Sequence, residues 1–201
     1  MSAYSGDVLF IHIPKTGGTA VKDYMAQCGS ISTEGFSTGH VRLIDTVKAT
    51  GRPVDSWRVI IAAIRDPYAQ QVSQWRFWAD RYARGQRHAD DIRAASSPDM
   101  TSWLSSDAGG GRWGYYRQWI CNELGEIPTN VTLIRQEELA EQFESVSGMT
   151  GGTFRTINAM GTRNVMEYYN SERFTGQALD VVEAKFAWTF SQGFYSKAVR
   201  V

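Results

Sequence analysis

One stretch of sequence constrains the fold most strongly: an apolar run that leads into a glycine turn and then into a helical pattern. Residues 8–14 read VLFIHIP, which is typical of a strand buried on both faces in a parallel sheet. The turn KTGG at 15–18 interrupts this run. Residues 19–27 then predict a helix, and Gly29 is suited to end it. A strand, a glycine turn and a helix therefore follow one another directly.

The same alternation continues along the chain. A buried strand is predicted over 58–64 (RVIIAAI), and Pro67 suits the first turn of a helix that extends to about Ala83. Further strands are predicted over 30–38 and 131–135, and further helices over 41–49, 115–124, 137–147 and 171–190. Alternating strands and helices predict an α/β fold that has a central, mainly parallel sheet flanked by helices.

The length of the chain favours one domain. A chain of 201 residues is within the usual size of a single domain, so we expect one domain over 1–201. The least regular part is 84–112, which includes three consecutive glycines. We predict that this insertion is a long loop with one short helix near 101–104.

The charge balance excludes some classes of function. The chain has 21 Lys and Arg against 21 Asp and Glu. A formal charge of zero argues against nonspecific nucleic-acid binding and against a polybasic membrane surface. The bases are nevertheless five Lys and sixteen Arg. Because arginine suits bidentate recognition of oxyanions, a zero net charge still leaves a few fixed anions open as ligands.

The sequence also indicates a compartment. Its two cysteines, Cys28 and Cys121, are too few for a disulfide scaffold, so we expect reduced thiols. Residues 1–7 lack the pattern of a signal peptide, and the longest apolar run, 59–64, is too short to span a membrane. We therefore expect a soluble, cytoplasmic protein.

The KTGG turn and the helix behind it have the features of a site for a phosphate-like anion. Glycines let the backbone approach a ligand closely, and N–H groups at a helix N-terminus point toward it. Lys15 adds a positive charge, and Thr16 and Thr19 add hydroxyl donors. The usual nucleoside-triphosphate pattern places the lysine after the glycines, whereas Lys15 precedes them. The alternative interpretation is a structural turn without a ligand.

A second motif, IRDPYAQQVSQW, begins at Ile64. Arg65 follows a buried strand, where α/β proteins bind ligands, and Ser73 is expected in the next helix. A guanidinium and a hydroxyl together suit a phosphate monoester. The alternative is a local ion pair of Arg65 with Asp66, with Ser73 on a solvated face.

Together these motifs resemble the membrane-associated (type 2) sulfotransferase family, which includes carbohydrate sulfotransferases. The resemblance rests on PKTGGT at 14–19 and RDP-x5-S at 65–73, and extends to GH at 39–40, LIRQEEL at 133–139, TRN at 162–164 and GFY at 193–195. It covers most of the chain except about 84–125, although 201 residues is short for this family.

The resemblance implies that the chain binds 3′-phosphoadenosine 5′-phosphosulfate (PAPS) in a P-loop-like domain. The residues that would hold the 5′-phosphosulfate are Lys15, Thr16, Gly17, Gly18, Thr19 and Ala20. Arg65 and Ser73 would hold the 3′-phosphate, and Arg163 and Asn164 would close over the cofactor. Ala20 stands where the family often has Ser or Thr, which removes one hydroxyl but leaves the backbone amides.

The implied reaction is in-line transfer of the sulfuryl group to a hydroxyl acceptor, either a carbohydrate or a small metabolite. Such a transfer needs alignment and charge stabilisation, and Lys15 can neutralise the charge that grows on the leaving nucleotide. For the general base we expect His40, with Glu34 and Asp45 as alternatives. The three histidines of the chain are scattered, so we expect no metal site.

Two other functions are compatible with the sequence. A nucleotide kinase or other P-loop phosphotransferase would require magnesium and ATP. A noncatalytic PAPS-binding protein would keep the anion site without turnover.

The arginine-rich segment 76–93 is expected to be a solvated helix face, and its alternative role is docking of an anionic acceptor. For His12, inside the first strand, we expect a core position.

Overall fold

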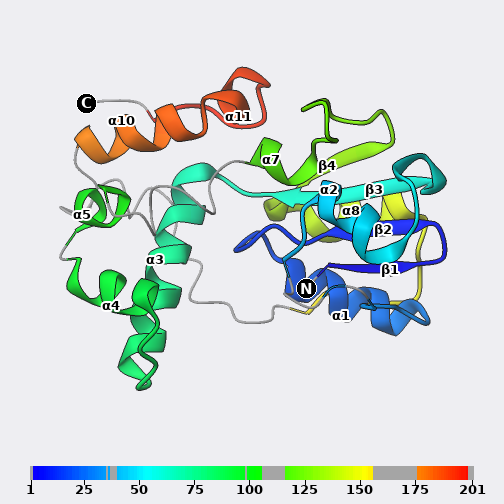
Figure 1. Cartoon of the computed structure of the whole chain (residues 1–201), viewed down its shortest axis with the longest axis horizontal. Coiled ribbons are helices and arrows are strands. Elements are labelled where there is room, and N and C mark those ends of the chain that lie inside the picture. Colours follow the sequence, from blue (N-terminus) through cyan, green and yellow to red (C-terminus); the bar gives the residue numbers. More distant parts are fainter. Residues whose placement is uncertain are drawn as a thin grey trace. The chain divides into compact units, whose positions relative to one another are not determined.

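The structure, a computed structural model, describes residues 2–34, 36, 40–97, 99–105, 116–155 and 176–198. The chain forms two compact units, Met1–Arg65 with Tyr116–Ala159 and Asp66–Tyr115 with Met160–Val201 (Figure 1). The first unit contains a β-sheet with helices on both faces, and the described part of the second unit is helical. The single domain expected over 1–201 stays a prediction.

The sheet of the first unit has four strands in the order β1-β2-β3-β4. These are β1 (Ala3–Ser5), β2 (Val8–Ile11), β3 (Val59–Ile64) and β4 (Val131–Arg135). β1 is antiparallel to β2, whereas β2, β3 and β4 are parallel to one another. The predicted α/β class with a mainly parallel sheet is therefore confirmed, and the strands predicted over 8–14, 58–64 and 131–135 are present.

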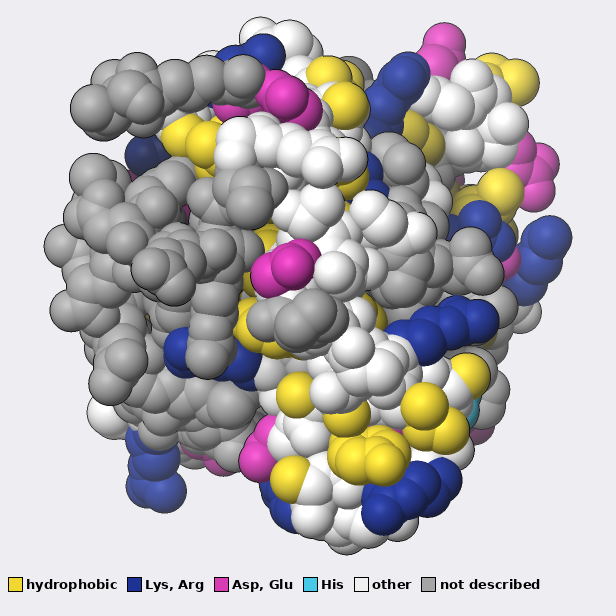
Figure 2. Space-filling view, turned by 90° about the vertical axis from the view of Figure 1, so that its left-hand side faces the viewer, with side chains coloured by type: hydrophobic (Ala, Val, Ile, Leu, Met, Phe, Trp, Pro, Cys, Tyr) yellow, Lys and Arg dark blue, Asp and Glu magenta, His cyan; other side chains and the backbone are white. Residues whose placement is uncertain are grey.

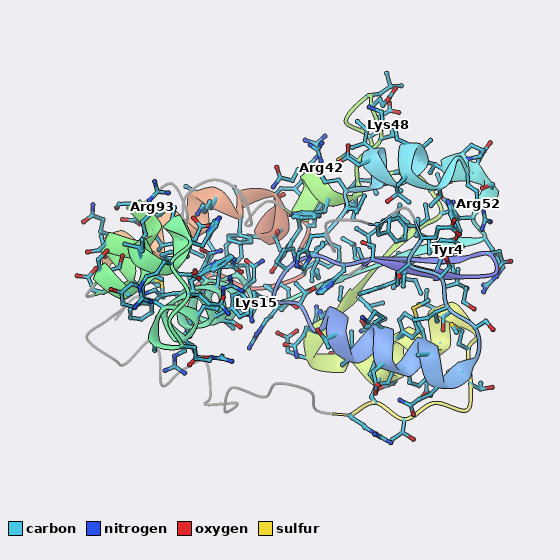
Figure 3. All side chains as sticks on the ribbon, turned by 60° about the horizontal axis from the view of Figure 1, so that its bottom comes forward. Tyr4, Lys15, Arg42, Lys48, Arg52 and Arg93 are labelled. Carbon is cyan, nitrogen blue, oxygen red and sulfur yellow. The ribbon has the colours of Figure 1, made fainter. Side chains whose placement is uncertain are left out.

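Helices cover both faces of this sheet, as its apolar strands require. Figure 3 shows α1 (Gly18–Cys28) and α8 (Leu139–Ser147) on one side and α2 (Leu43–Thr50) on the other. Successive strand residues point to opposite faces, so Phe10 and Ile61 pack with Tyr24 of α1 and Phe143 of α8. The unit also contains α7 (Tyr116–Ile120), which packs on α2, and the 3₁₀ turns Val54–Ser56 and Gln136–Glu138.

One predicted strand of this unit is wrong, and one strand was not predicted. Among the described residues of 30–38, only Ser32 forms a bridge, through two backbone hydrogen bonds of 3.0 and 2.8 Å with Tyr4. This stretch is polar and has no apolar run to bury. The place beside β2 is taken by β1, whose three residues are too few to give a periodic signal.

In the second unit, α3 matches the predicted helix. It spans Pro67–Ala83, and the Asp66 carboxylate accepts a hydrogen bond of 2.9 Å from the Ala69 N–H at its start. The other helices are α4 (Ala89–Ser96), α5 (Met100–Ser105), α10 (Gly176–Lys185) and α11 (Ala187–Ser191). The helix predicted over 171–190 is thus two helices that meet at Phe186, and its expected start at Ser171 lies outside the described residues.

The insertion at 84–112 is more regular than predicted where it is described. The short helix expected near 101–104 is present as α5, but α4 was expected to be loop. A capping box at its start explains this helix: His88 Nδ1 accepts from the Asp90 N–H, and the fully buried Asp91 carboxylate accepts from the His88 N–H. Arg81 of α3 also donates to Asp91 at 2.9 Å.

Candidate functional site

The glycine turn between β2 and α1 has an unusual backbone. Lys15 has φ of 66°, which non-glycine residues rarely adopt and which costs about 1–3 kcal/mol, and Gly17 has φ of 86°. The N–H groups of Ala20 and Val21 donate to the Gly17 carbonyl. The N–H groups of the first turn before them have no acceptor within a helix, and the dipole of α1 is positive at this end. The turn therefore offers the amide donors expected of an anion site.

Packing leaves no room for a side chain at Gly18 and little at Gly17. A Cβ on Gly18 would lie 1.9 Å from Cδ2 of His12, and a Cβ on Gly17 would lie 2.9 Å from Cδ2 of Leu139. His12 is 7% exposed directly after β2, which confirms the core position expected for it. Burial lowers its pKa, so its ring is neutral near pH 7. Gly18 therefore lies directly against this ring.

Arg65 lies against the turn. Because β2 and β3 are parallel neighbours, residues that follow them meet at the same edge of the sheet. Arg65 Nη1 donates to the Lys15 carbonyl at 3.4 Å. Burial and, second, the neighbouring guanidinium lower the Lys15 pKa to about 8. The structure thus brings together the two cations that the sequence places in different motifs.

Tyr116 holds Arg65 in place, and sequence reasoning did not identify this role. Its hydroxyl donates to the Arg65 carbonyl at 2.7 Å and lies 3.3 Å from the Arg65 N–H, for which it is the acceptor. Tyr116 is 1% exposed at the start of α7. Its only sequence signal was a position beside aromatic residues and a glycine run, which indicates packing as readily as function.

His40 lies beside the same turn. Its Nδ1 is 3.2 Å from the His12 carbonyl, and the two rings are 4.5 Å apart. Because a carbonyl only accepts, Nδ1 carries the hydrogen and Nε2 keeps the lone pair. Burial lowers the His40 pKa, against a smaller opposite effect of this hydrogen bond. A neutral imidazole with a basic Nε2 is what a general base requires.

The other predicted site residues of the first unit differ in exposure. Thr16 is fully buried and its hydroxyl donates to the Ile13 carbonyl at 2.8 Å, so that hydroxyl stabilises the turn from within. Thr19 is exposed and Ala20 half-buried on the first turn of α1. Of the alternative bases, Glu34 is exposed and Asp45 forms an ion pair of 2.7 Å with Arg42.

The remaining predicted residues lie elsewhere. Ser73 is half-buried on α3 in the second unit, which is described by itself. Arg163 and Asn164 lie outside the described residues. The assignment of these three residues to the cofactor therefore stays a prediction.

Within the arginine-rich segment 76–93, basic side chains pair with acidic ones. Arg81 pairs with Asp91, and Arg84 pairs with Asp80 one helical turn away. Figure 2 shows dark blue basic and magenta acidic side chains dispersed over the drawn face. The exposed Arg84–Asp80 pair suits the expected solvated helix face. The Asp91 carboxylate that pairs with Arg81 is instead fully buried and joins α4 to α3. The docking role of the segment stays a prediction.

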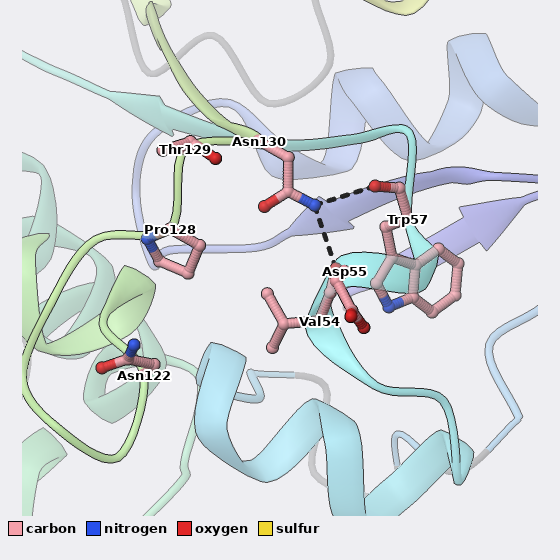
Figure 4. Close-up of a pocket in the computed structure, with 7 residues that line it drawn as sticks. All are labelled: Val54, Asp55, Trp57, Asn122, Pro128, Thr129 and Asn130. Atoms are coloured by element: carbon pink, nitrogen blue, oxygen red, sulfur yellow. Dashed lines mark hydrogen bonds between the residues drawn. The ribbon is translucent and has the colours of Figure 1, made fainter.

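A hollow of about 450 Å³ lies at the other edge of the sheet, by Trp57 before β3 and Asn130 before β4 (Figure 4). Asn130 Nδ2 donates to the Val54 and Trp57 carbonyls at 2.9 and 2.8 Å. None of the predicted site residues lines this hollow.

Two absences among the described residues concern metal binding and membranes. In the described ranges, no group of three or more His, Cys, Asp or Glu side chains could hold a metal ion. No helix in the part of the chain that is described is long and apolar enough to cross a membrane.

Comparisons with family models, with curated proteins and with solved structures find no match for this chain. The resemblance to sulfotransferases therefore rests on the motifs quoted above.

Proposed function

We propose that this protein is a sulfotransferase that moves the sulfuryl group of PAPS to a hydroxyl acceptor. The observation that carries the proposal is the meeting of Lys15 and Arg65 around a glycine turn at the N-terminus of α1. Burial and, second, the nearby Arg65 guanidinium lower the pKa of Lys15, so part of this lowering reflects repulsion between two cations. A polyanionic ligand would relieve that repulsion, which suits a nucleotide with charged groups at both its 3′ and 5′ positions.

The donor set at the turn fits PAPS. The amides at the start of α1, the Lys15 ammonium and the Thr19 hydroxyl are suited to the 5′-phosphosulfate in a P-loop-like arrangement. The Arg65 guanidinium is suited to the 3′-phosphate, and we assign Ser73 to the same group. Arg163 and Asn164 are proposed to close over the nucleotide. PAPS supplies the activated sulfuryl group.

The side chains beside the turn have complementary tasks in the proposed reaction. The acceptor oxygen forms the new S–O bond while the bond from sulfur to the 5′-phosphate oxygen breaks. Lys15 neutralises the charge that grows on that leaving oxygen. The acceptor proton passes to Nε2 of His40, whose Nδ1 hydrogen bond to the His12 carbonyl orients the ring.

The acceptor is proposed to be a hydroxylated small molecule or a carbohydrate. The proposed compartment is the cytoplasm, which is supported by Cys28 and Cys121, neither of which forms a disulfide.

Turnover of PAPS against a panel of hydroxylated acceptors tests the proposal. Wild type should release 3′-phosphoadenosine 5′-phosphate (PAP) only when an acceptor is present. Lys15→Ala should lower kcat far more than nucleotide affinity, because its partner charge develops in the transition state. Lys48→Ala, which removes an exposed lysine of α2, is the control and should retain wild-type kcat. Equal losses of kcat and affinity in Lys15→Ala would contradict the assigned role.

A further inference from the structure

Trp119 of α7 is a buried indole that lies beside His40. It is 4% exposed, and the centroids of the two rings are 6.4 Å apart with an interplanar angle of 79°. This is an edge-to-face pair, which aromatic rings form at centroid separations of about 4.5–7 Å. The proposed reaction uses His40 as the general base and so far gives no task to Trp119.

The orientation of the His40 ring depends on its neighbours. His40 is half-buried and lies outside the helices and strands. The hydrogen bond between its Nδ1 and the His12 carbonyl sets the tautomer. A single hydrogen bond still allows the plane of the ring to tilt. The His12 ring, at 4.5 Å and 56°, and the Trp119 ring approach the imidazole at different angles, so together they restrict this tilt.

Trp119 is held in turn by its helix. α7 packs on α2, which begins at Leu43, three residues after His40. Tyr116 and Trp119 are three residues apart on α7, so they lie on one side of the helix, and both are buried. The Tyr116 hydroxyl bonds to the backbone of Arg65. One side of α7 therefore contacts both the proposed base and the arginine that is proposed to bind the 3′-phosphate.

Orientation matters to a general base more than to most buried side chains. The base must come within about 2.6–3.2 Å of the atom whose proton it takes. A displacement of about 1 Å at a reacting group can lower the rate about 10²-fold. A side chain that fixes the plane of the His40 ring therefore acts on catalysis without meeting the substrate.

We propose that Trp119 is a positioning residue for His40, because its indole holds the imidazole in the orientation in which Nε2 receives the acceptor proton. The consequence for catalysis rests on the proposed function. The effect of Trp119 on the His40 ring does not, and it is measured without nucleotide or acceptor.

Nitrogen-15 NMR of the histidine side chains measures that effect. At pH 8 a histidine with the ordinary pKa of about 6.5 is neutral, and its protonated and unprotonated ring nitrogens have different chemical shifts. In wild type, His40 should show one tautomer with the hydrogen on Nδ1. In Trp119→Leu the ring is less restricted, so both tautomers should be populated and the two nitrogen shifts should move toward each other. Wild-type shifts in folded Trp119→Leu would overturn the proposal.

Two further variants separate positioning from the general loss of a buried indole. Trp57→Leu makes the same change at a 2% exposed position before β3, at the other edge of the sheet, and should keep the wild-type shifts of His40. Trp119→Phe keeps an aromatic ring beside His40 and should retain the Nδ1 tautomer. Equal changes in Trp57→Leu and Trp119→Leu would indicate a general effect of packing and would overturn the positioning role.

Turnover of PAPS measures the consequence for catalysis. Trp119→Leu should lower kcat about 10²-fold and change PAP affinity far less. His40→Gln keeps the two proposals distinguishable. If His40→Gln lowers kcat and Trp119→Leu does not, the positioning role fails while the proposed function stands. If His40→Gln leaves kcat unchanged, the proposed base is wrong, whereas the effect of Trp119 on the ring stands or falls by the NMR measurement.

Wild type alone provides a readout if the Trp119 variants do not fold. The edge-to-face pair predicts a nuclear Overhauser effect between ring protons of His40 and Trp119. Its absence, or equal population of both His40 tautomers in wild type, would overturn the proposal.

Discussion

Under the proposed function, the lowered pKa of Lys15 should make nucleotide affinity depend on pH in a range where an ordinary lysine does not titrate. Burial and the Arg65 guanidinium lower this pKa from 10.5 to about 8. In the proposed site, only the ammonium form of Lys15 would attract the 5′-phosphosulfate of PAPS or the 5′-phosphate of PAP. Raising the pH through 8 removes this proton from Lys15 in the unliganded protein. PAP binding must then restore the proton, so the affinity for PAP should fall as the pH rises.

The magnitude follows from the two protonation states. With a pKa of about 8, the ammonium fraction falls from about nine-tenths at pH 7 to about one-tenth at pH 9. A ligand that requires the ammonium then binds about tenfold more weakly, which is about 1.4 kcal/mol. A lysine with the ordinary pKa would remain almost fully charged at pH 9. The nucleotide itself changes little, because the second pKa of its phosphates is about 6.

Isothermal titration with PAP at pH 7 and pH 9 measures this effect. Wild type and the control Lys48→Arg should each lose about tenfold in affinity. Lys15→Arg should lose little, because a guanidinium stays charged at both pH values. A wild-type affinity that is constant from pH 7 to 9 would refute the reasoning, as would an equal loss in Lys15→Arg.

Three other predictions concern neighbours of the turn. Tyr116→Phe should reduce the preference for PAP over nucleotides without a 3′-phosphate, measured as a ratio of dissociation constants. Tyr24→Phe, which removes a similar hydroxyl bond to a backbone carbonyl, should leave that ratio unchanged, and equal ratios in both variants would contradict the role of Tyr116. Gly18→Ala should lower the free energy of unfolding, measured in urea, by about 1–3 kcal/mol, because the Cβ of the new alanine would overlap the His12 ring. An unchanged urea midpoint would contradict this prediction and would show that the ring moves without cost. His40→Gln should lower kcat/KM by about 10²–10⁴-fold. The pH profile of wild type should have an acidic limb below the ordinary histidine pKa of 6.5, because burial lowers the pKa of His40, and the variant should lack this limb. An acidic limb that is retained in the variant would assign the general base to another residue.

The elements that the sequence predicted well are those with one dominant local signal. The apolar run RVIIAAI became β3, and Pro67 after Asp66 marked the start of α3 because proline and an acidic cap both favour a first turn. The elements it missed depend on partners. β1 is three residues long and exists because β2 pairs with it. α4 depends on a capping box and on Arg81 of another helix.

In the candidate site, too, the features with a local sequence signal were predicted and those that depend on contacts between distant residues were not. The glycine turn and Arg65 were visible because each follows an apolar strand, and parallel pairing then brings them together. The hydrogen bonds from Tyr116 to Arg65 join residues 51 positions apart, and the His12 ring beneath Gly18 is a packing relation. Neither relation has a local signature in the sequence, so each becomes visible only in the folded structure.

Nucleotide selectivity tests the central claim most directly. A calorimetric titration of wild type compares PAP, ADP, which lacks the 3′-phosphate, and ATP with magnesium. The proposed function predicts that PAP binds at least about tenfold more tightly than ADP and needs no magnesium. Binding of ATP only with magnesium, without binding of PAP, would contradict it and would favour a phosphotransferase.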